Sequence, residues 1–217
     1  MSEEREIALE ARAVKASRMF SPSAARNRDP IREAFLALMP RQGTIVEIGS
    51  GTGEHAVHIA AAAPLLFWRP GDPDAASRAS IAAWTAHLSL ENVAAPHAVD
   101  ASIAGWEAAF DEADGVVSIN MIHIAPFEVA EGLIAGASRL LKPGGRLFLY
   151  GPFSRDGVHT SPSNAEFDAA LRARDSRWGV RDLERDIAPL AESVGLSIVA
   201  VVAMPANNFS AAFQKAR

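Results

Sequence analysis

The chain has 217 residues, of which 49% are hydrophobic and 22% charged, the composition of an ordinary globular protein with one domain or one domain and a modest appendage. It contains no cysteine, which excludes disulfides, thiolate metal ligands and cysteine nucleophiles. The formal net charge of −5, without a run of Lys and Arg, argues against a nucleic-acid partner, and no apolar stretch has the ~20 residues of a membrane helix. We therefore expect a cytoplasmic protein that binds neither nucleic acid nor a membrane.

The first segment, residues 1–19, is rich in Ala, Glu, Lys and Arg. We expect either a polar helix or a partly ordered leader here, with the domain itself spanning residues 20–217. Asp29 and Pro30 predict the first helix of the domain, with Asp29 as its cap and Pro30 at the first helical position. The Pro and Gly residues at 40–43 end that helix.

From residue 44 onward, short apolar runs alternate with helical segments. Strands are predicted at 44–48, 65–68, 93–99, 115–122 and 146–150, and helices at 55–62, 74–89 and 128–141. This alternation indicates a parallel sheet with helices on both faces, which the right-handed crossover rule makes doubly wound.

The last part of the chain has a different order of elements. Helices at 164–173 and 181–194 precede strands at 196–203 and 209–214, which a short turn joins. Two strands joined by a short turn are antiparallel. The predicted fold class is therefore α/β, with a doubly wound, mostly parallel seven-stranded sheet that ends in a C-terminal antiparallel hairpin.

A glycine-rich loop, Glu47-x-Gly49-Ser50-Gly51-x-Gly53, leaves the first strand and opens a helix. Free backbone N–H groups and the helix dipole meet at such a junction, and glycines let the backbone approach a ligand. The G-x-G-x-G spacing is neither the dinucleotide G-x-G-x-x-G nor a P-loop. Glu47 would oppose a pyrophosphate but suits a cationic ligand. S-adenosylmethionine, with a sulfonium, an amino group and no phosphate, is the ligand that this loop favours.

Two aspartates follow the next two strands. Asp72 lies 19 residues after Gly53, where a carboxylate can accept hydrogen bonds from ribose hydroxyls. Asp100, followed by Ala101, could receive the adenine amino group. Each aspartate could instead cap a turn or a helix. Acidic residues at the ends of three successive strands nevertheless favour a cofactor site along that edge of the sheet.

Together these residues resemble the class I S-adenosylmethionine-dependent methyltransferases. Residues 47–53 match the first motif of that family, Asp72 the second and Asp100 the third, and Leu-Leu-Lys-Pro-Gly-Gly at 140–145 matches the turn before its fifth strand. The resemblance covers about residues 20–217. Shorter strings at 21–27, 118–124, 150–153, 163–168, 174–179 and 204–208 are similar to one subfamily, that of methyltransferase-like protein twenty-six, a former domain of unknown function. No substrate follows from this closer resemblance.

The methyl acceptor is expected beyond the ends of the fourth and fifth strands. Asn120 and His123 end the fourth strand without the Asn/Asp-Pro-Pro-aromatic string typical of enzymes that methylate amide or base nitrogens. Asn120 is expected beside the cofactor. His123 is the candidate general base because its ordinary pKa lies near neutrality, or else it lines the cofactor or caps the next helix. The subfamily resemblance favours ligand contacts for Arg26 and Asn27, against a solvated Arg26 and an Asn27 that forms a turn.

His55 and His58 lie three residues apart on one helix, but the order is not H-E-x-x-H and no third ligand is evident. We predict no metal, and expect His55 to pack at the edge of the cofactor.

The predicted function is methyl transfer from S-adenosylmethionine to a small molecule, because the chain has little beyond the core fold with which to grip a large partner. The alternative of a different class is a non-catalytic scaffold that retains the cofactor pocket. A nicotinamide-dependent dehydrogenase is excluded by the glycine spacing and by the absence of a Tyr-x-x-x-Lys pair.

Overall fold

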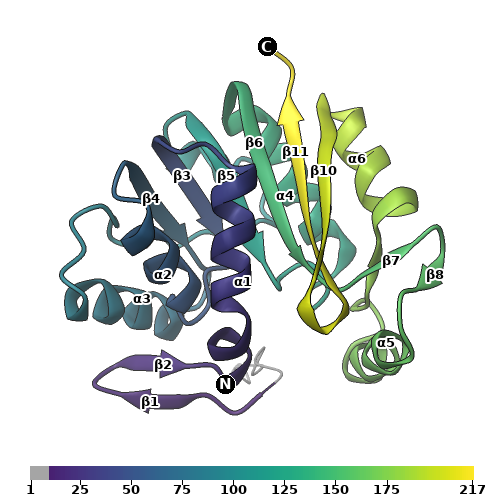
Figure 1. The fold of residues 1–217 in the computed structure, drawn as a ribbon, viewed down its shortest axis with the longest axis horizontal. Coiled ribbons are helices and arrows are strands. Elements are labelled where there is room, and N and C mark those ends of the chain that lie inside the picture. The colour runs from purple at the N-terminus through teal and green to yellow at the C-terminus, as the bar shows by residue number, and fades with distance from the viewer. Residues whose placement is uncertain (1–9) are drawn as a thin grey trace.

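A six-stranded sheet forms the centre of the protein in the computed structural model, which describes residues 10–217 (Figure 1). The strand order is β10-β11-β6-β5-β3-β4. These strands are β3 (Gly43–Ile48), β4 (Leu66–Gly71), β5 (Ala113–Ile119), β6 (Leu141–Gly151), β10 (Leu196–Met204) and β11 (Asn208–Lys215). The first four run parallel, while β11 is antiparallel to both β6 and β10. The predicted α/β class with a terminal antiparallel hairpin is confirmed.

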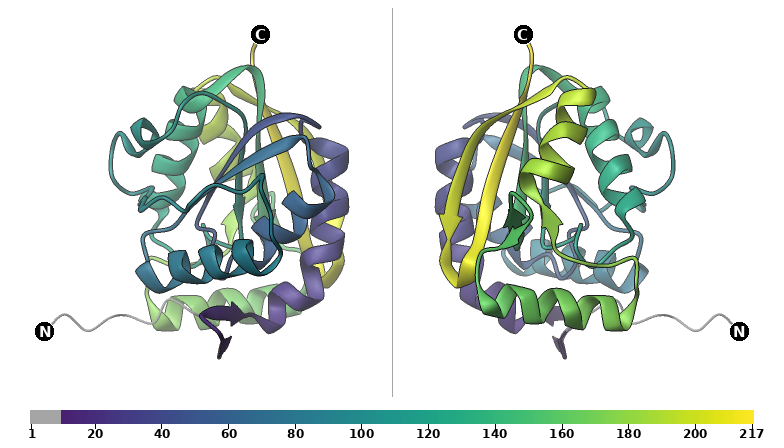
Figure 2. Two further views of the ribbon diagram at one scale, coloured as in Figure 1. Left: turned by 90° about the vertical axis from the view of Figure 1, so that its left-hand side faces the viewer. Right: turned by 90° about the vertical axis from the view of Figure 1, so that its right-hand side faces the viewer.

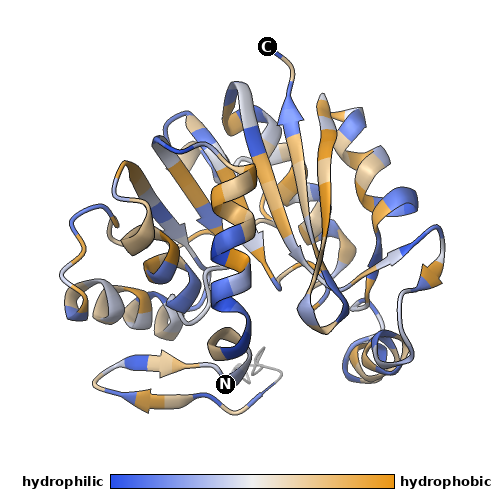
Figure 3. Ribbon diagram, viewed as in Figure 1, coloured by the Kyte–Doolittle hydropathy of each residue, from blue (hydrophilic) through white to orange (hydrophobic). Residues whose placement is uncertain are grey.

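Helices cover both faces of the sheet. They are α1 (Pro22–Leu38), α2 (Glu54–Ala62), α3 (Ala75–His87), α4 (Phe127–Leu140), α5 (Pro162–Arg174) and α6 (Ala188–Ser193), with helical turns at Trp106–Ala109, Leu183–Ile187 and Pro205–Asn207. One apolar core joins the sheet to α1 and α2, and another joins it to α4 and α6. The most hydrophobic residues accordingly concentrate in the central strands (Figure 3). No helix in the part of the chain that the structure describes is both long and apolar enough to cross a lipid bilayer.

The predicted strand at 93–99 does not form, so the sheet has six strands and not seven. Within the part of the chain that the structure describes, two isolated bridges, Trp68 with Val93 and Gly71 with His97, and the backbone hydrogen bonds around them connect this segment to β4. Two prolines explain the interruption, because neither Pro70 nor Pro96 has an N–H to donate to a strand ladder. The carbonyl of Pro70 is instead satisfied by the N–H of His97 at 2.9 Å.

The first helix starts earlier than Asp29 and Pro30 predict. Ser21 caps α1, and its Oγ accepts a hydrogen bond from the Ala24 N–H at 3.1 Å. The pair Ser21-Pro22 therefore provides the serine cap and the proline at the first helical position. Pro30 lies inside the helix, and Asp29 pairs with His58 at 2.8 Å on its exposed side.

The N-terminal segment forms a hairpin and not a helix. Strands β1 (Ala13–Lys15) and β2 (Arg18–Phe20) pair antiparallel around Ala16 and Ser17, whose φ values are 50° and 64°. Positive φ at both turn residues is the two-residue hairpin geometry that Asn and Gly normally adopt. The expectation of a polar helix is wrong for residues 13–19, and the part of it that concerns residues 1–9 lies outside the described residues.

The segment after β6 builds a small three-stranded sheet and helix α5. Its strands are β7 (Phe153–Arg155), β8 (Val158–His159) and β9 (Arg181–Asp182), in the order β8-β7-β9. The predicted helix at 181–194 thus begins with β9 and a π-helical turn, where the Asp182 carboxylate caps Glu184 and Arg185. Both α5 and the N-terminal hairpin lie at the end of the molecule toward which the parallel strands point (Figures 1 and 2).

Candidate functional site

The glycine loop between β3 and α2 is a tight backbone arch. Gly49, Gly51 and Gly53 have φ values of 73°, 55° and 84°, which alternate with ordinary residues and account for the G-x-G-x-G spacing. The Gly71 carbonyl, at the end of β4, accepts from the N–H groups of Gly49 at 2.9 Å and Ser50 at 3.2 Å. Ser50 is buried beneath the loop. The end of β4 therefore fixes the start of the loop.

The three loop glycines differ in what surrounds them. A Cβ on Gly49 would lie 2.7 Å from the Met121 side chain, and one on Gly53 would lie 2.9 Å from the Ile81 backbone. A Cβ on Gly51 would meet, among the described residues, one atom within 4 Å, Arg12 Nη2 at 3.9 Å. Packing within the protein thus accounts for the outer two glycines, while Gly51 presents bare backbone toward a space that a ligand could use.

Asp72 stands directly beside this open backbone. Its Oδ2 accepts from the Gly51 N–H at 2.8 Å, and its Oδ1 accepts from the Asp74 N–H at 2.9 Å. Only 7% of the residue is exposed, and burial raises the pKa of its carboxyl group. Each oxygen keeps a second lone pair, so the group is held in place and still able to accept a hydrogen bond.

Glu47 lies under the glycine loop and not on its open side. It is 1% exposed, and its Oε2 accepts a hydrogen bond from the Trp68 indole at 3.0 Å. Burial raises the pKa of Glu47 to about 7. The predicted contact of Glu47 with a cofactor remains a prediction, and a nearby cation would favour the ionised form of its carboxyl group.

One carboxylate oxygen of Asp100 stabilises a turn, which is the alternative that the sequence left open for this residue. Asp100 Oδ1 accepts from the Ser102 N–H at 2.8 Å and from the Ser102 hydroxyl at 2.7 Å. Ala101 is buried, and Gly132 of α4 packs so closely on its carbonyl that a Cβ there would overlap it. The loop after the missing strand is therefore held by α4.

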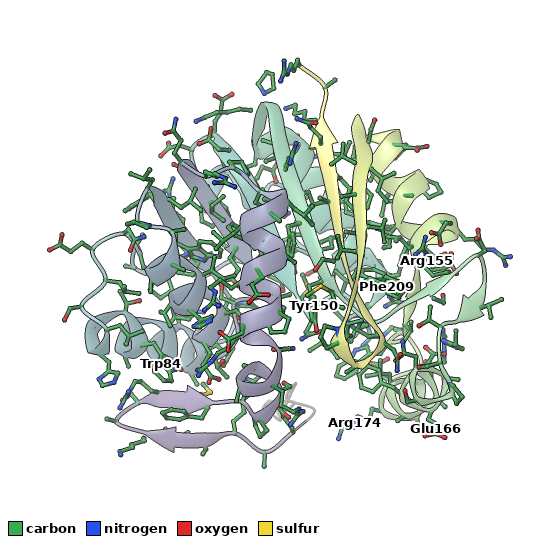
Figure 4. All side chains as sticks on the ribbon, in the orientation of Figure 1. Trp84, Tyr150, Arg155, Glu166, Arg174 and Phe209 are labelled. Carbon is green, nitrogen blue, oxygen red and sulfur yellow. The ribbon has the colours of Figure 1, made fainter. Side chains whose placement is uncertain are left out.

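Asn27 links α1 to α2 and to the end of β6. Its Oδ1 lies 2.9 Å from His55 Nε2, and its side chain also hydrogen bonds to the Tyr150 hydroxyl. Burial lowers the pKa of His55 to about 4, and the positive charges of His58 and Arg28 add to that effect. Tyr150 lies near the lower end of β6 in Figure 4. The structure thus brings together two residues that the sequence singled out, Asn27 and His55, with Tyr150 as a third member.

Arg26 does not join this network. Its side chain is exposed, and the group it influences electrostatically is Glu10, which is bonded to Ser21 and Ser23 at the start of α1. The predicted contact of Arg26 with a cofactor remains a prediction without a supporting contact.

His123 is enclosed in the loop that follows β5. It is 3% exposed, its ring lies 5.8 Å from that of Phe167 in α5, and a Cβ on Gly151 would lie 3.2 Å from its Nδ1. Burial lowers its pKa to about 3, and Arg181 contributes in the same direction. The Nδ1 atom is buried without a hydrogen-bond partner among residues 10–217. The free protein therefore holds a neutral imidazole with one unused polar atom.

A buried arginine fixes the loop that carries His123. Arg181 donates from Nε to the Ile122 carbonyl at 3.1 Å and from Nη2 to the Ala125 carbonyl at 2.6 Å. Asn120, which precedes the loop, has a φ of 54°, and its N–H donates to the Tyr150 carbonyl at 2.8 Å. Asn120 and His123, which were predicted near the acceptor, are thus parts of one braced loop between β5 and α4.

Several residues of this region were missed by the sequence analysis. Arg12, Thr52, Glu54 and Ser80 all contact the glycine loop or its neighbours. The short spacing that reveals a glycine loop carries no information on Arg12 or Ser80, because each is brought to the loop by a different element.

Solved structures with the same architecture support the assignment of the fold. An O-methyltransferase family protein from Burkholderia thailandensis is 18% identical, with a TM-score of 0.76, over 89% of this chain and 56% of that one. An O-methyltransferase family 2 protein from Planctomyces limnophilus, solved with apigenin, is 18% identical, with a TM-score of 0.73, over 89% and 60%. Human N-acetylserotonin methyltransferase, solved with S-adenosylmethionine, is 15% identical, with a TM-score of 0.71, over 90% and 53%.

These similarities define the fold, which is that of the class I methyltransferases. The chain spans little more than half the length of these structures, 53% to 60% of each. A family model described as protein of unknown function (DUF938) matches residues 18–215. The chain belongs to that family.

Proposed function

We propose that the protein binds S-adenosylmethionine at the glycine loop and transfers its methyl group to a small-molecule acceptor. The observation that carries the proposal is the bare backbone of Gly51 beside the anchored carboxylate of Asp72. Both lie at the carboxyl ends of parallel strands, where open α/β sheets bind their ligands. The solved relatives with S-adenosylmethionine and with apigenin support the cofactor and the small size of the acceptor.

The residues present suit the chemistry of that cofactor. Asp72 would accept hydrogen bonds from the ribose hydroxyls, and Asp100 has a second oxygen beyond its turn for the adenine amino group. Glu47, which titrates near neutrality, would become ionised beside a sulfonium or amino group and stabilise it through the loop. No phosphate-binding lysine is required.

When bound, the cofactor supplies a methyl group on a positively charged sulfur, and the reaction is an in-line displacement. The protein has to align the acceptor atom with the methyl group and exclude water, so positioning contributes most of the rate. We assign this positioning to Asn27, whose side chain joins His55 and Tyr150 at the acceptor side.

We propose that His123 accepts a hydrogen bond from the group of the acceptor that is to be methylated. A pKa of about 3 makes its neutral ring a weak base in the free protein, so we assign it first a hydrogen bond from the acceptor to Nδ1. Access of an acceptor to this ring requires its surroundings to open, since the residue is 3% exposed. That enclosure is also the observation that favours the alternative, a protein that binds the cofactor without catalysis.

The proposal also includes the subfamily of the protein and its location in the cytoplasm. The strings at 21–27, 118–124 and 204–208 support membership in the subfamily of methyltransferase-like protein twenty-six. The absence of cysteine is compatible with the reducing conditions of the cytoplasm.

Binding of S-adenosylhomocysteine tests the proposal before any acceptor is known. We expect it to raise the melting temperature while NAD does not, and we expect Asp72→Asn and Asp72→Ala to weaken binding by about 1–3 kcal/mol in calorimetry. Asp111→Ala is the matched control, because it removes an exposed carboxylate whose ion-pair partner among the described residues is Arg69, at the surface. Equal stabilisation by both compounds, or by neither, would refute the cofactor assignment.

Transfer of a labelled methyl group to metabolite extracts then separates the enzyme from the non-catalytic alternative. Binding without any labelled product across extracts would favour the scaffold.

A further inference from the structure

The N-terminal hairpin is attached to the glycine loop by a chain of specific contacts. The Met19 N–H donates to Ser80 Oγ at 2.8 Å, and Ser80 Oγ donates to the Thr52 carbonyl of the loop at 2.7 Å. Trp84 Nε1 donates to the Met19 carbonyl at 2.9 Å, and its ring packs edge-on against Phe20 at 4.9 Å. Trp84 lies between α3 and the hairpin in Figure 4.

A second attachment fixes the chain where the hairpin enters α1. The Ser21 N–H donates to Glu54 Oε2 at 2.7 Å, and the same oxygen accepts from the Thr52 hydroxyl at 3.0 Å. Thr52 and Glu54 of the loop region therefore fix the chain at the point where the hairpin leads into α1. This many directed contacts indicate a built cover over the site and not a loosely attached leader.

Arg12, at the start of the hairpin, is the residue of this cover that faces the site. Its Nη2 is the nearest described atom to the open face of Gly51, and its positive charge acts on the Asp72 carboxyl group. Its Nε is buried without a hydrogen-bond partner among the described residues. A guanidinium with a buried, unpaired Nε donor calls for an anion, and a carboxylate matches its fork geometry.

The other charged side chains near the loop are less well placed than Arg12 to bind an anionic group. Glu47, Asp72 and Glu54 are acidic and cannot bind a carboxylate ligand favourably. Arg28 acts on His55 and His58, farther along α2, and Arg26 is exposed. Arg12 is thus the cation best placed for an anionic group that lies over Gly51.

We propose that the hairpin β1–β2 covers the cofactor site and that Arg12 binds the carboxylate of the cofactor's amino-acid portion. This inference rests on the proposed function. Without ligand, the charge of Arg12 is attracted to the Asp72 carboxyl group. With ligand, the guanidinium exchanges that partner for the carboxylate, so binding and closure of the cover support each other.

Two ligands that differ only in the amino-acid portion test the inference. S-adenosylhomocysteine carries the carboxylate, whereas 5′-methylthioadenosine has the same adenosine and thioether without it. In calorimetry, we expect Arg12→Gln to raise the Kd of S-adenosylhomocysteine about 10- to 100-fold, the loss expected for a hydrogen-bonded ion pair, and to leave that of 5′-methylthioadenosine nearly unchanged. Arg12→Lys, which keeps the charge and loses the fork, should fall between.

The controls separate the side chain from the cover. Lys15→Gln removes an exposed positive charge from the same hairpin and should change neither Kd. Trp84→Ala removes the main attachment of the hairpin and should weaken binding of S-adenosylhomocysteine as Arg12→Gln does. Melting curves of each unliganded variant establish that it is folded.

The outcomes distinguish the two levels of the argument. If wild-type protein binds neither ligand, the proposed function fails. If wild type binds both and Arg12→Gln weakens both equally or neither, the proposed function stands and the role of Arg12 is wrong.

Discussion

Replacing Glu47 with Gln should change how the stability of the protein depends on pH. The carboxyl group is buried at 1% exposure with the Trp68 indole as donor, and Gln keeps an oxygen that can accept the same hydrogen bond. The substitution therefore removes the titration of Glu47 while preserving its volume and its main contact.

The magnitude follows from the pKa of Glu47. Folding raises it from 4.5 to about 7, and one pKa unit corresponds to about 1.4 kcal/mol. The native state holds a proton between these two values that the unfolded chain has lost, so stability decreases as pH rises through this window. Above it, wild-type protein carries the full cost of a buried carboxylate, about 3 kcal/mol. Glu47→Gln should thus match wild type near pH 4 and be about 3 kcal/mol more stable near pH 8.

Urea unfolding of both proteins at a series of pH values measures this difference. His55 and His123 act in the opposite direction, because their lowered pKa values cost stability as pH falls below the ordinary histidine range. Both proteins contain them, so their effect cancels in the difference between the two free energies of unfolding. Parallel pH curves would show that Glu47 is ionised in the folded protein, and the reasoning from burial would be refuted.

Further predictions concern the loop, the helix cap and the histidines. Gly53→Ala should lower the free energy of unfolding by about 1–3 kcal/mol more than Gly105→Ala. Both glycines have nearly the same positive φ, 84° and 82°, but only a Cβ on Gly53 would lie 2.9 Å from the backbone of another described residue. Equal losses in urea titrations would contradict this. Ser21→Ala should cost about 1 kcal/mol as the loss of a helix cap, and an unchanged unfolding midpoint would argue against it. In NMR titrations, His55 and His123 should stay neutral at about pH 5, since their pKa values are about 4 and about 3; a ring signal that titrates near pH 6.5 would exclude this.

The sequence predicted the six strands of the central sheet, together with a seventh at 93–99 that does not form. The glycine loop and Asp72 follow the two strands of one β-α-β unit. Strand periodicity and spacing therefore predict that they lie at the same edge of the sheet. Asn27 and Tyr150 meet only because α1 packs across β6, a contact between residues 123 positions apart that no local pattern encodes.

The errors have local physical causes. The hairpin at 13–20 turns through Ala16 and Ser17, which lack the Asn or Gly that normally signals such a turn. Two possible helix starts, Ser21-Pro22 and Asp29-Pro30, compete in α1, and the first is chosen because Glu10 and Glu54 secure Ser21. Such choices depend on tertiary partners.

The interrupted pairing beside β4 also affects how the protein meets other chains. An exposed strand edge is a template for uncontrolled addition of further strands, and natural proteins block it with prolines. Pro70 and Pro96 break the ladder along one border of the sheet, and the segment at 93–97 lies over it. The opposite border, β10, carries the partly exposed side chains of Ile198 and Val202. The two borders are thus unequally protected, and an added strand would meet fewer obstacles at β10 than at the border that adjoins the loop of Asp100.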